Sequence, residues 1–299
     1  MMMSIQWTGG IVLAAALMFP VGHLAARDKP TCSQFSKGAI PRAMAIQQIE
    51  CEWVSRRLLI MGEIHGTEEI PALLTDLIVA QPVNRPIRIG FEWPVAQQAA
   101  VNRYLQSAGT AADLAELTAG PYWEHPDGRM SHAWLTLLDK VRELRRRDRD
   151  IDVFMMEPDY GDAESIRAAG GVLAMKEAGI ARSIQTVLRT APPDTVVAAL
   201  MGNYHPRVGK DSPDPDSSVA IRLRAIHPLI LMPYARRQTA WLCQADGCGS
   251  HTSNSSKPGV TVGMIEMEAL PGAPSGVLAE EVQLHALTAS APANEVITH

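Results

Sequence analysis

The sequence predicts an α/β fold in which a mainly parallel central sheet is flanked by helices. Short apolar runs typical of buried strands alternate with segments of helical periodicity along the chain. This alternation is typical of sheets built from strand-helix-strand units. With 299 residues and a hydrophobic content of 46%, the chain can bury a large core, so we expect a single domain over residues 27–288.

The first half of the chain contributes three predicted strands. The apolar run at 58–61 stops at a glycine, the run at 87–91 is followed by Glu92-Trp93-Pro94, and the run at 151–156 ends at Glu157-Pro158. Proline cannot donate to a sheet ladder and therefore marks a strand end. Helical patterns separate the strands, and we expect helices at 41–56, 68–80 with Thr67 as cap, 95–106, and 132–147 with Ser131 as cap.

The second half of the chain alternates in the same way. A helix at 163–190 is interrupted at Gly170-Gly171, a fourth strand follows at 195–201, and a short helix at 217–225 leads to a strand at 229–232. Later apolar stretches predict edge strands at 265–270 and 282–287. We expect residues 289–299 to form a frayed C-terminal tail.

The N-terminus has the features of a signal peptide over residues 1–26. Its apolar stretch at 11–19 is too short to span a bilayer, and Ala25-Ala26 offers small residues for cleavage before Arg27. No Lys or Arg precedes the apolar stretch, which leaves an uncleaved anchor as the alternative. We therefore expect a periplasmic or secreted protein without a stable membrane span once the signal is removed.

Four cysteines fall into two sequence-local pairs, Cys32 with Cys51 and Cys243 with Cys248. An oxidising compartment favours a disulfide within each pair. A zinc site is the alternative, but neither pair has CxxC spacing and the two pairs are far apart in the sequence. We expect two disulfides.

The charge balance argues against a nucleic-acid partner. The formal net charge is -5, and the one basic cluster, at 145–149, ends a predicted helix, where cations are favourable. The expected partner is a small-molecule or peptide substrate.

The candidate site begins at the end of the first strand, where Glu63 and His65 follow Gly62. If strand geometry persists there, side chains two residues apart point the same way. Glu92 and Glu157 end the next two strands, and His205 follows the fourth. Because ligands bind beyond the carboxyl ends of parallel strands, we expect these five side chains to converge there.

An internal repeat supports this convergence. Gly62-Glu63-Ile64-His65 and Gly202-Asn203-Tyr204-His205 each follow a strand and precede a helix and a further strand. His65 is 22 positions before Ile87, and His205 is 24 positions before Leu229. The fold is thus predicted to contain two related strand-GxxH-helix-strand units, which would place both histidines at equivalent strand ends facing one crevice.

These residues resemble a known superfamily. Two Gly-x-x-His motifs at strand ends, with a glutamate after the next strand, are similar to the group that contains erythromycin esterases, ChaN-like haem-binding lipoproteins, Tiki proteases and TraB-type proteins. The spacing in Gly62-Glu63-Ile64-His65 is most similar to the ChaN-like branch, although this chain lacks the lipid-attachment cysteine of that branch. The resemblance implies an α/β fold and a crevice containing Glu63, His65, Glu92 and His205, and members of the group differ in activity.

Two versions of hydrolysis fit this crevice. Glu63, His65, Glu92 and His205 could ligate a divalent metal whose bound water attacks an ester or amide carbonyl, with Glu157 orienting a ligand or acting as base. Without a metal, His65 could deprotonate the water itself, and Arg129 or Asn203 could stabilise the oxyanion.

Binding without turnover is the alternative function. Tyr122, Tyr204 or a histidine could be the axial ligand of a haem, with Trp93, Trp123 and methionines as an apolar wall. The same loop at 121–129 could instead be a lid in which Tyr122, Trp123 and Trp93 bind substrate, or a surface loop whose aromatic rings only pack on the domain.

Overall fold

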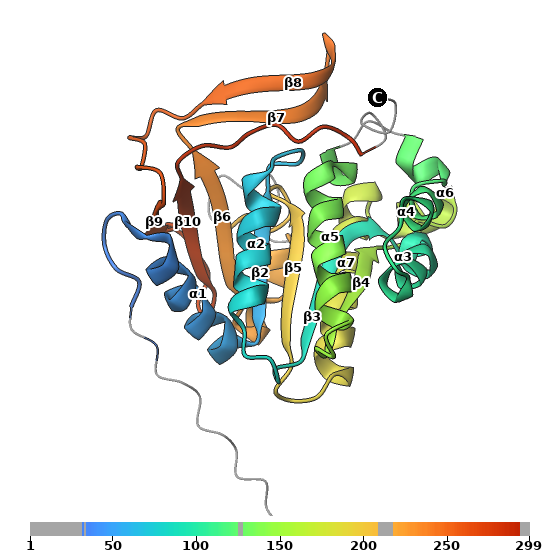
Figure 1. The fold of residues 1–299 in the computed structure, drawn as a ribbon, viewed down its shortest axis with the longest axis horizontal. Coiled ribbons are helices and arrows are strands. Elements are labelled where there is room, and N and C mark those ends of the chain that lie inside the picture. Colours follow the sequence, from blue (N-terminus) through green and yellow to red (C-terminus); the bar gives the residue numbers. More distant parts are fainter. Residues whose placement is uncertain (1–31, 33, 125–127, 209–217, 294–299) are drawn as a thin grey trace, which may run out of the picture.

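The computed structural model describes residues 32, 34–124, 128–208 and 218–293, and confirms the α/β class. An eight-stranded sheet runs in the order β1-β9-β10-β6-β2-β5-β3-β4, with helices on both faces (Figure 1). The strands from β10 to β4 are parallel to their neighbours, while β9 is antiparallel to both β10 and β1. The predicted signal peptide lies outside the described residues.

The strands of the large sheet are β1 (Ile40–Pro41), β2 (Leu58–Glu63), β3 (Ile87–Pro94), β4 (Ile151–Glu157), β5 (Val196–Gly202), β6 (Leu229–Ala235), β9 (Met264–Ala269) and β10 (Leu278–Leu284). A separate hairpin consists of β7 (Arg237–Gln244) and β8 (Gly247–Asn254).

The helices are α1 (Arg42–Arg56), α2 (Glu69–Ala80), α3 (Gln98–Gln106), α4 (Ala111–Leu117), α5 (His132–Arg145), α6 (Ala163–Ala168), α7 (Val172–Thr190) and α8 (Val219–Arg222). Short 3-10 turns are η1 (Val95–Gln97), η2 (Pro121–Glu124), η3 (Gly128–Met130) and η4 (Arg224–Ile226). Ser131 is the N-cap residue of α5, as predicted, but its side chain makes no capping hydrogen bond. The N-cap residue of α2 is Glu68 and not Thr67, contrary to our prediction.

Two hydrophobic clusters hold the helices against the sheet, one on each face. Leu59 and Met61 of β2 belong to the cluster that contains α1, α2 and α5, whereas Leu58 and Ile60 belong to the cluster that contains α7 and α8. Successive strand residues point to opposite faces, so a strand covered on both sides must be apolar throughout. This explains the continuous apolar run of β2.

The connections place the two Gly-x-x-His segments next to each other. Strands β2 and β5 are neighbours at the centre of the sheet, and Glu63 is paired with Gly202 at their carboxyl ends. From β2 the chain passes over one face to β3 beyond β5, and from β5 it passes over the other face to β6 beyond β2. The carboxyl ends of β2 and β5 therefore lie where the strand order reverses, the usual position of a ligand site in such sheets.

Two sequence predictions about the C-terminal third are wrong, and one hairpin, β7–β8, was not predicted. Neither of the strands predicted at an edge lies there, because β9 has β1 and β10 as neighbours and β10 has β9 and β6. Residues 289–293 do not fray: the amide of Ser290 donates to Gly66 O (2.8 Å), the amide of Ala293 donates to Met130 O (2.9 Å), and Ser290 is fully buried. Residues 294–299 lie outside the described part of the chain.

Both predicted disulfides are present, Cys32–Cys51 beside α1 and Cys243–Cys248 at the tip of the β7–β8 hairpin. No helix within the described residues is both long enough and apolar enough to cross a membrane.

One buried hydrogen bond attaches α1 to the centre of the sheet, and we predict that its loss destabilises the fold. The indole Nε1 of Trp53 donates to Val197 O (2.9 Å) and the side chain is fully buried. Trp53→Phe keeps an aromatic ring but leaves the carbonyl without this donor. We expect a loss of about 1–3 kcal/mol in the free energy of unfolding, measured by urea denaturation.

Trp241→Phe is the matched control, because the Nε1 atom of Trp241 has no hydrogen-bond partner among the described residues. If the two variants lose the same stability, the hydrogen bond of Trp53 is not the cause.

Candidate functional site

The carboxyl edge of the sheet brings both histidines to one glutamate. Glu92, in β3, has one oxygen 3.2 Å from His205 Nε2 and the other 3.6 Å from His65 Nε2. Glu63 and Glu157 end the flanking strands β2 and β4. The structure therefore places the predicted histidine and glutamate side chains at one edge of the sheet.

Glu63 and His65 form a hydrogen-bonded pair. The Nδ1 atom of His65 lies 2.8 Å from Glu63 Oε2, and the other oxygen of Glu63 accepts a 2.7 Å bond from Trp134 Nε1. Burial raises the pKa of Glu63. Burial by itself would lower the pKa of His65, but the carboxylates of Glu63 and Glu92 outweigh it and raise that pKa. The 23% exposure of the His65 side chain makes it the more accessible imidazole.

The backbone after His65 is held by segments from the C-terminal third of the chain. Gly66 has φ 74°, a left-handed conformation suited to glycine, and its carbonyl accepts hydrogen bonds from Trp241 N (2.9 Å) and Ser290 N (2.8 Å). Gly202 leaves room on the other side: a Cβ atom there would lie 2.7 Å from His65 Nε2. The imidazole of His65 is thus held in place by the backbone that follows it, and it occupies the space left by the missing side chain of Gly202.

Glu92 is a buried carboxylate surrounded by positive groups. Besides the two imidazoles, it contacts Lys176 Nζ at 2.7 Å and Arg129 Nη1 at 3.2 Å, and its other oxygen accepts a 2.5 Å bond from the amide of Gly202. Burial would raise the pKa of Glu92, but these partners hold it well below its usual range. Glu92 is therefore ionised at neutral pH.

His205 is held between two carboxylates. Its Nδ1 atom lies 2.7 Å from Glu177 Oε1, on α7, and its Nε2 atom faces Glu92. The second oxygen of Glu177 accepts a 2.7 Å bond from the amide of Val219. Burial opposes the charged ring, but the two carboxylates raise the pKa of His205 to about 9. This imidazole is a cation at neutral pH.

Glu157 shares its cations with Glu92. Arg129 Nη1 lies 3.1 Å and Lys176 Nζ 3.2 Å from Glu157 Oε2, while Tyr160 Oη donates to Oε1 (2.7 Å). The contact with Glu157 adds to the burial that raises the pKa of Tyr160. Glu157 thus positions Arg129 and Lys176 and does not contact either histidine directly. Asn203 contributes its backbone amide, which donates to Glu63 O (2.8 Å).

The aromatic residues expected to bind substrate lie inside the fold. Trp93 and Trp123 are both buried, and the two rings meet edge-on with centroids 5.2 Å apart. Trp93 also stacks on Trp134 at 5.7 Å, and Tyr122 packs against both Trp93 and Trp123. This packing supports the interpretation of the 121–129 loop as one whose rings pack on the domain. Residues 125–127 of that loop lie outside the described chain.

The side chains predicted as metal ligands do not fit a metal centre. Among the described residues, no group of three or more His, Cys, Asp or Glu side chains is arranged to hold a metal ion. The carboxylate of Glu92 already forms ion pairs with Lys176 and Arg129. Both oxygens of Glu63 already form hydrogen bonds, one with His65 and one with Trp134.

The predicted apolar wall of a haem site is also absent from the surface, because Trp93 and Trp123 are buried in the core and cannot contact a bound haem. Tyr204 differs from them: it is 36% exposed, its ring lies 5.9 Å from that of His205, and Arg207 lies 5.2 Å above it.

Sequence reasoning missed three residues that complete the site: Trp134, Lys176 and Glu177. All three lie on helices. A Lys-Glu pair such as Lys176-Glu177 is common on the solvent-exposed face of a helix, so it did not stand out in the sequence of α7. One signal was present, because Glu177 stands three, four and seven positions before Ile180, Ala181 and Ile184, the buried face of that helix. An acid on an apolar helix face indicates a buried polar partner.

No protein-family model matches the sequence, and no curated protein resembles it closely enough to count as a match. Solved structures do match. A histidine-to-asparagine mutant of the erythromycin esterase EreC, in its open conformation, aligns with 81% of this chain and 93% of its own, at 10% identity and a TM-score of 0.54. A succinoglycan biosynthesis protein aligns with 80% of this chain and 90% of its own, at 8% identity and a TM-score of 0.54.

Two further structures are more distant. ChaN of Campylobacter jejuni, described with cofacial haem, aligns with 66% of this chain and 90% of its own, at 9% identity and a TM-score of 0.39, too low to support an argument. A structure of bacterial protein toxins matches at a TM-score of 0.44 and 16% identity over 63% of this chain, which spans only 36% of the toxin chain. The chain therefore shares the fold of the erythromycin esterase structure, in line with the resemblance found in its sequence.

We predict that His205 titrates far above an ordinary histidine. Its ion pairs stabilise the fold fully below the unfolded-state pKa of about 6.5, and that contribution is lost as pH rises through about 9. Glu177→Gln removes one of the two carboxylates and should lower the His205 pKa toward the ordinary value. NMR titration of the imidazole measures the pKa of His205 in the wild-type protein and in Glu177→Gln.

Glu164→Gln, an exposed substitution on α6, is the control and should leave the titration of His205 unchanged. A wild-type pKa close to 6.5 would contradict the buried two-carboxylate arrangement.

Proposed function

We propose that this protein is an exported hydrolase that cleaves an ester or amide bond with a water molecule activated by His65. The observation that carries the proposal is the 2.8 Å contact between the more accessible imidazole and the buried carboxylate of Glu63. An acid that accepts the Nδ1 proton of a histidine fixes the ring and leaves Nε2 as the base, as in catalytic triads. Here water takes the place of a serine nucleophile.

The proposed reaction has two steps. Water gives a proton to Nε2 of His65 while its oxygen bonds to the carbonyl carbon, and the carbonyl π electrons move to the oxygen. The tetrahedral intermediate then collapses, and the leaving alkoxide or amine takes the proton back from Nε2. Glu63 stabilises the imidazolium between these two steps.

Developing negative charge would be met by the cations around Glu92. The side chains of Arg129 and Lys176 are partly accessible, and His205 supplies a further positive charge. Preorganised charges of this kind lower the barrier because they need not reorient during the reaction. We assign Arg129 to the oxyanion, with Asn203 as the alternative donor, and Glu92 and Glu157 to holding these groups in place.

The substrate class and the compartment belong to the same proposal. The shared fold with a protein named as an erythromycin esterase favours a small-molecule ester by analogy. Two disulfides favour an oxidising compartment, so we propose a periplasmic or secreted location.

The second candidate function is haem binding without turnover, and the exposed Tyr204 beside His205 and Arg207 is the observation that favours it. A phenolate can be an axial haem ligand. Titration with hemin separates the two functions: a saturable shift of the Soret band, lost in Tyr204→Phe, together with no hydrolysis of any ester tested, would replace hydrolysis by binding.

We predict that His65→Gln lowers kcat on a chromogenic ester by about 100-fold or more, the range expected for loss of a general base. The measurement is release of nitrophenol from a panel of short and long acyl esters. His227→Gln is the matched control, because His227 is an exposed histidine just before β6, at the opposite end of that strand from the site. Equal activity in wild type and His65→Gln would contradict the assignment.

The pH profile gives an independent prediction. The base must be uncharged, so activity should rise with pH through the pKa of His65, which the neighbouring carboxylates place above the ordinary histidine value. Glu63→Gln removes one of those charges and should move this rise to lower pH while lowering kcat. A rise that stays at the same pH in Glu63→Gln would show that another group is the base.

A further inference from the structure

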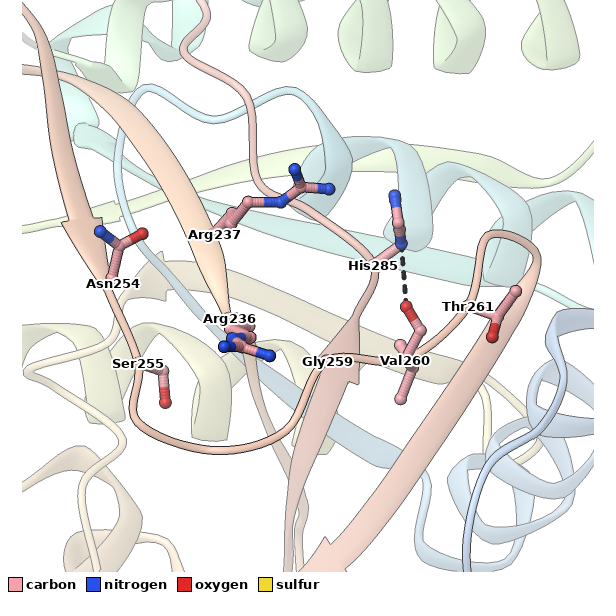
Figure 2. Close-up of a pocket in the computed structure, with 8 residues that line it drawn as sticks. All are labelled: Arg236, Arg237, Asn254, Ser255, Gly259, Val260, Thr261 and His285. Carbon is pink, nitrogen blue, oxygen red and sulfur yellow. Dashed lines mark hydrogen bonds between the residues drawn. The ribbon is translucent and has the colours of Figure 1, made fainter.

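A cavity of about 640 Å³ opens where β6 turns into β7, and it shares no lining residue with the His65 site (Figure 2). Its volume lies in the range of small-molecule sites. Its lining comes from the β6–β7 corner, the end of β8, the loop before β9 and the residue after β10, and consists of Arg236, Arg237, Asn254, Ser255, Gly259, Val260, Thr261 and His285.

The cavity is positively charged in a protein whose net charge is negative. Arg236 and Arg237 are both exposed, and neither has an acidic partner within the described part of the chain. By contrast, the guanidinium group of Arg42 pairs with Asp76, and that of Arg103 pairs with Glu116. None of the described residues that line the cavity is acidic. The two guanidinium groups come from consecutive residues that both line the cavity, and with no carboxylate in the lining they provide N–H donors without a local counter-charge.

The walls of the cavity are held mainly by backbone hydrogen bonds, and the Ser255 hydroxyl accepts from Lys257 N (3.2 Å) but keeps its own proton to donate. The carbonyl of Arg236 accepts from Ser255 N (3.0 Å), and that of Arg237 accepts from Leu287 N (3.1 Å). The Nδ1 atom of His285 lies 2.8 Å from Val260 O. A carbonyl oxygen can only accept a hydrogen bond, so Nδ1 of His285 carries the proton. The other ring nitrogen, Nε2, points away from the Val260 carbonyl (Figure 2).

We propose that this cavity binds the tetrahedral oxoanion of a small phosphate or sulfate ester. Guanidinium groups recognise such oxygens through paired hydrogen bonds, and a tetrahedral group offers more acceptor oxygens than a carboxylate. Arg236 and Arg237 supply the charge, and the amide of Asn254 with the hydroxyls of Ser255 and Thr261 supply neutral donors. The cavity is larger than the oxoanion alone, so the organic part of the ester has room beside it. This site is independent of the proposed hydrolysis.

Isothermal titration calorimetry tests the proposal with four probes: inorganic phosphate, inorganic sulfate, glycerol phosphate and glycerol. We expect one saturable site per chain for glycerol phosphate, weaker binding of the inorganic ions, and none of glycerol. A stronger response to sulfate than to phosphate would assign the site to sulfate esters. Arg236→Gln and Arg237→Gln should each weaken binding about tenfold or more, as for loss of a charge-assisted hydrogen bond.

Arg224→Gln is the matched control, because Arg224 is an exposed arginine outside the cavity with no acidic partner among the described residues. Equal weakening in Arg224→Gln would show unspecific attraction to positive charge and overturn the proposal. So would the absence of binding of every oxoanion, or tighter binding of a dicarboxylate than of glycerol phosphate.

A second measurement uses the wild-type protein alone. Phenylglyoxal modifies exposed arginines, and mass spectrometry of peptides locates the modification. Glycerol phosphate should protect Arg236 and Arg237 and leave Arg224 reactive; unchanged reactivity of all three at saturating ligand would overturn the site.

Discussion

The ionised carboxylate of Glu92 is the constraint on which the rest of the site depends. A buried charge is tolerated only if it is paired and hydrogen-bonded. Glu92 meets this requirement with the amide at the end of β5, the imidazole after β2, the imidazole after β5 and the cations from η3 and α7. Removing any one partner leaves the charge less compensated, so each of these segments is held to the others through the same carboxylate.

The carboxylate also sets the difference between the two histidines. His205 lies between two acids, is buried and carries a positive charge at neutral pH. His65 is more exposed and has one close acid at Nδ1, with Glu92 at a longer distance from Nε2. Under the proposed mechanism, two imidazoles from similar motifs are thereby given different roles, one as a fixed cation and one as a base. The presence of Asn203 at the position equivalent to Glu63 agrees with this division.

The centre of the fold was predictable because buried parallel strands require continuous apolar runs, and these end where charged residues begin. Glu63, His65, Glu92 and His205 were found from that rule. Lys176, Glu177 and Trp134 were not, because a helix shows several faces and the sequence does not say which one meets the strand ends. The hairpin β7–β8 was missed for another reason: its residues are mostly exposed and polar, so no apolar period marks it. Strand β10 carries Glu280, Glu281 and Gln283, a composition typical of an edge strand, although β9 and β6 cover both of its sides.

The double anchoring of Gly66 bears on how the protein matures. Ribosomes deliver the chain from its N-terminus, so the segment with His65 emerges long before Trp241 and Ser290, whose amides hold it. A nascent chain that already contains every charged group of the crevice still lacks the two clamps that orient the proposed base. Under the proposed mechanism, the base is therefore oriented only after the segments with Trp241 and Ser290 have joined the fold, so local folding around β2 is not sufficient for activity.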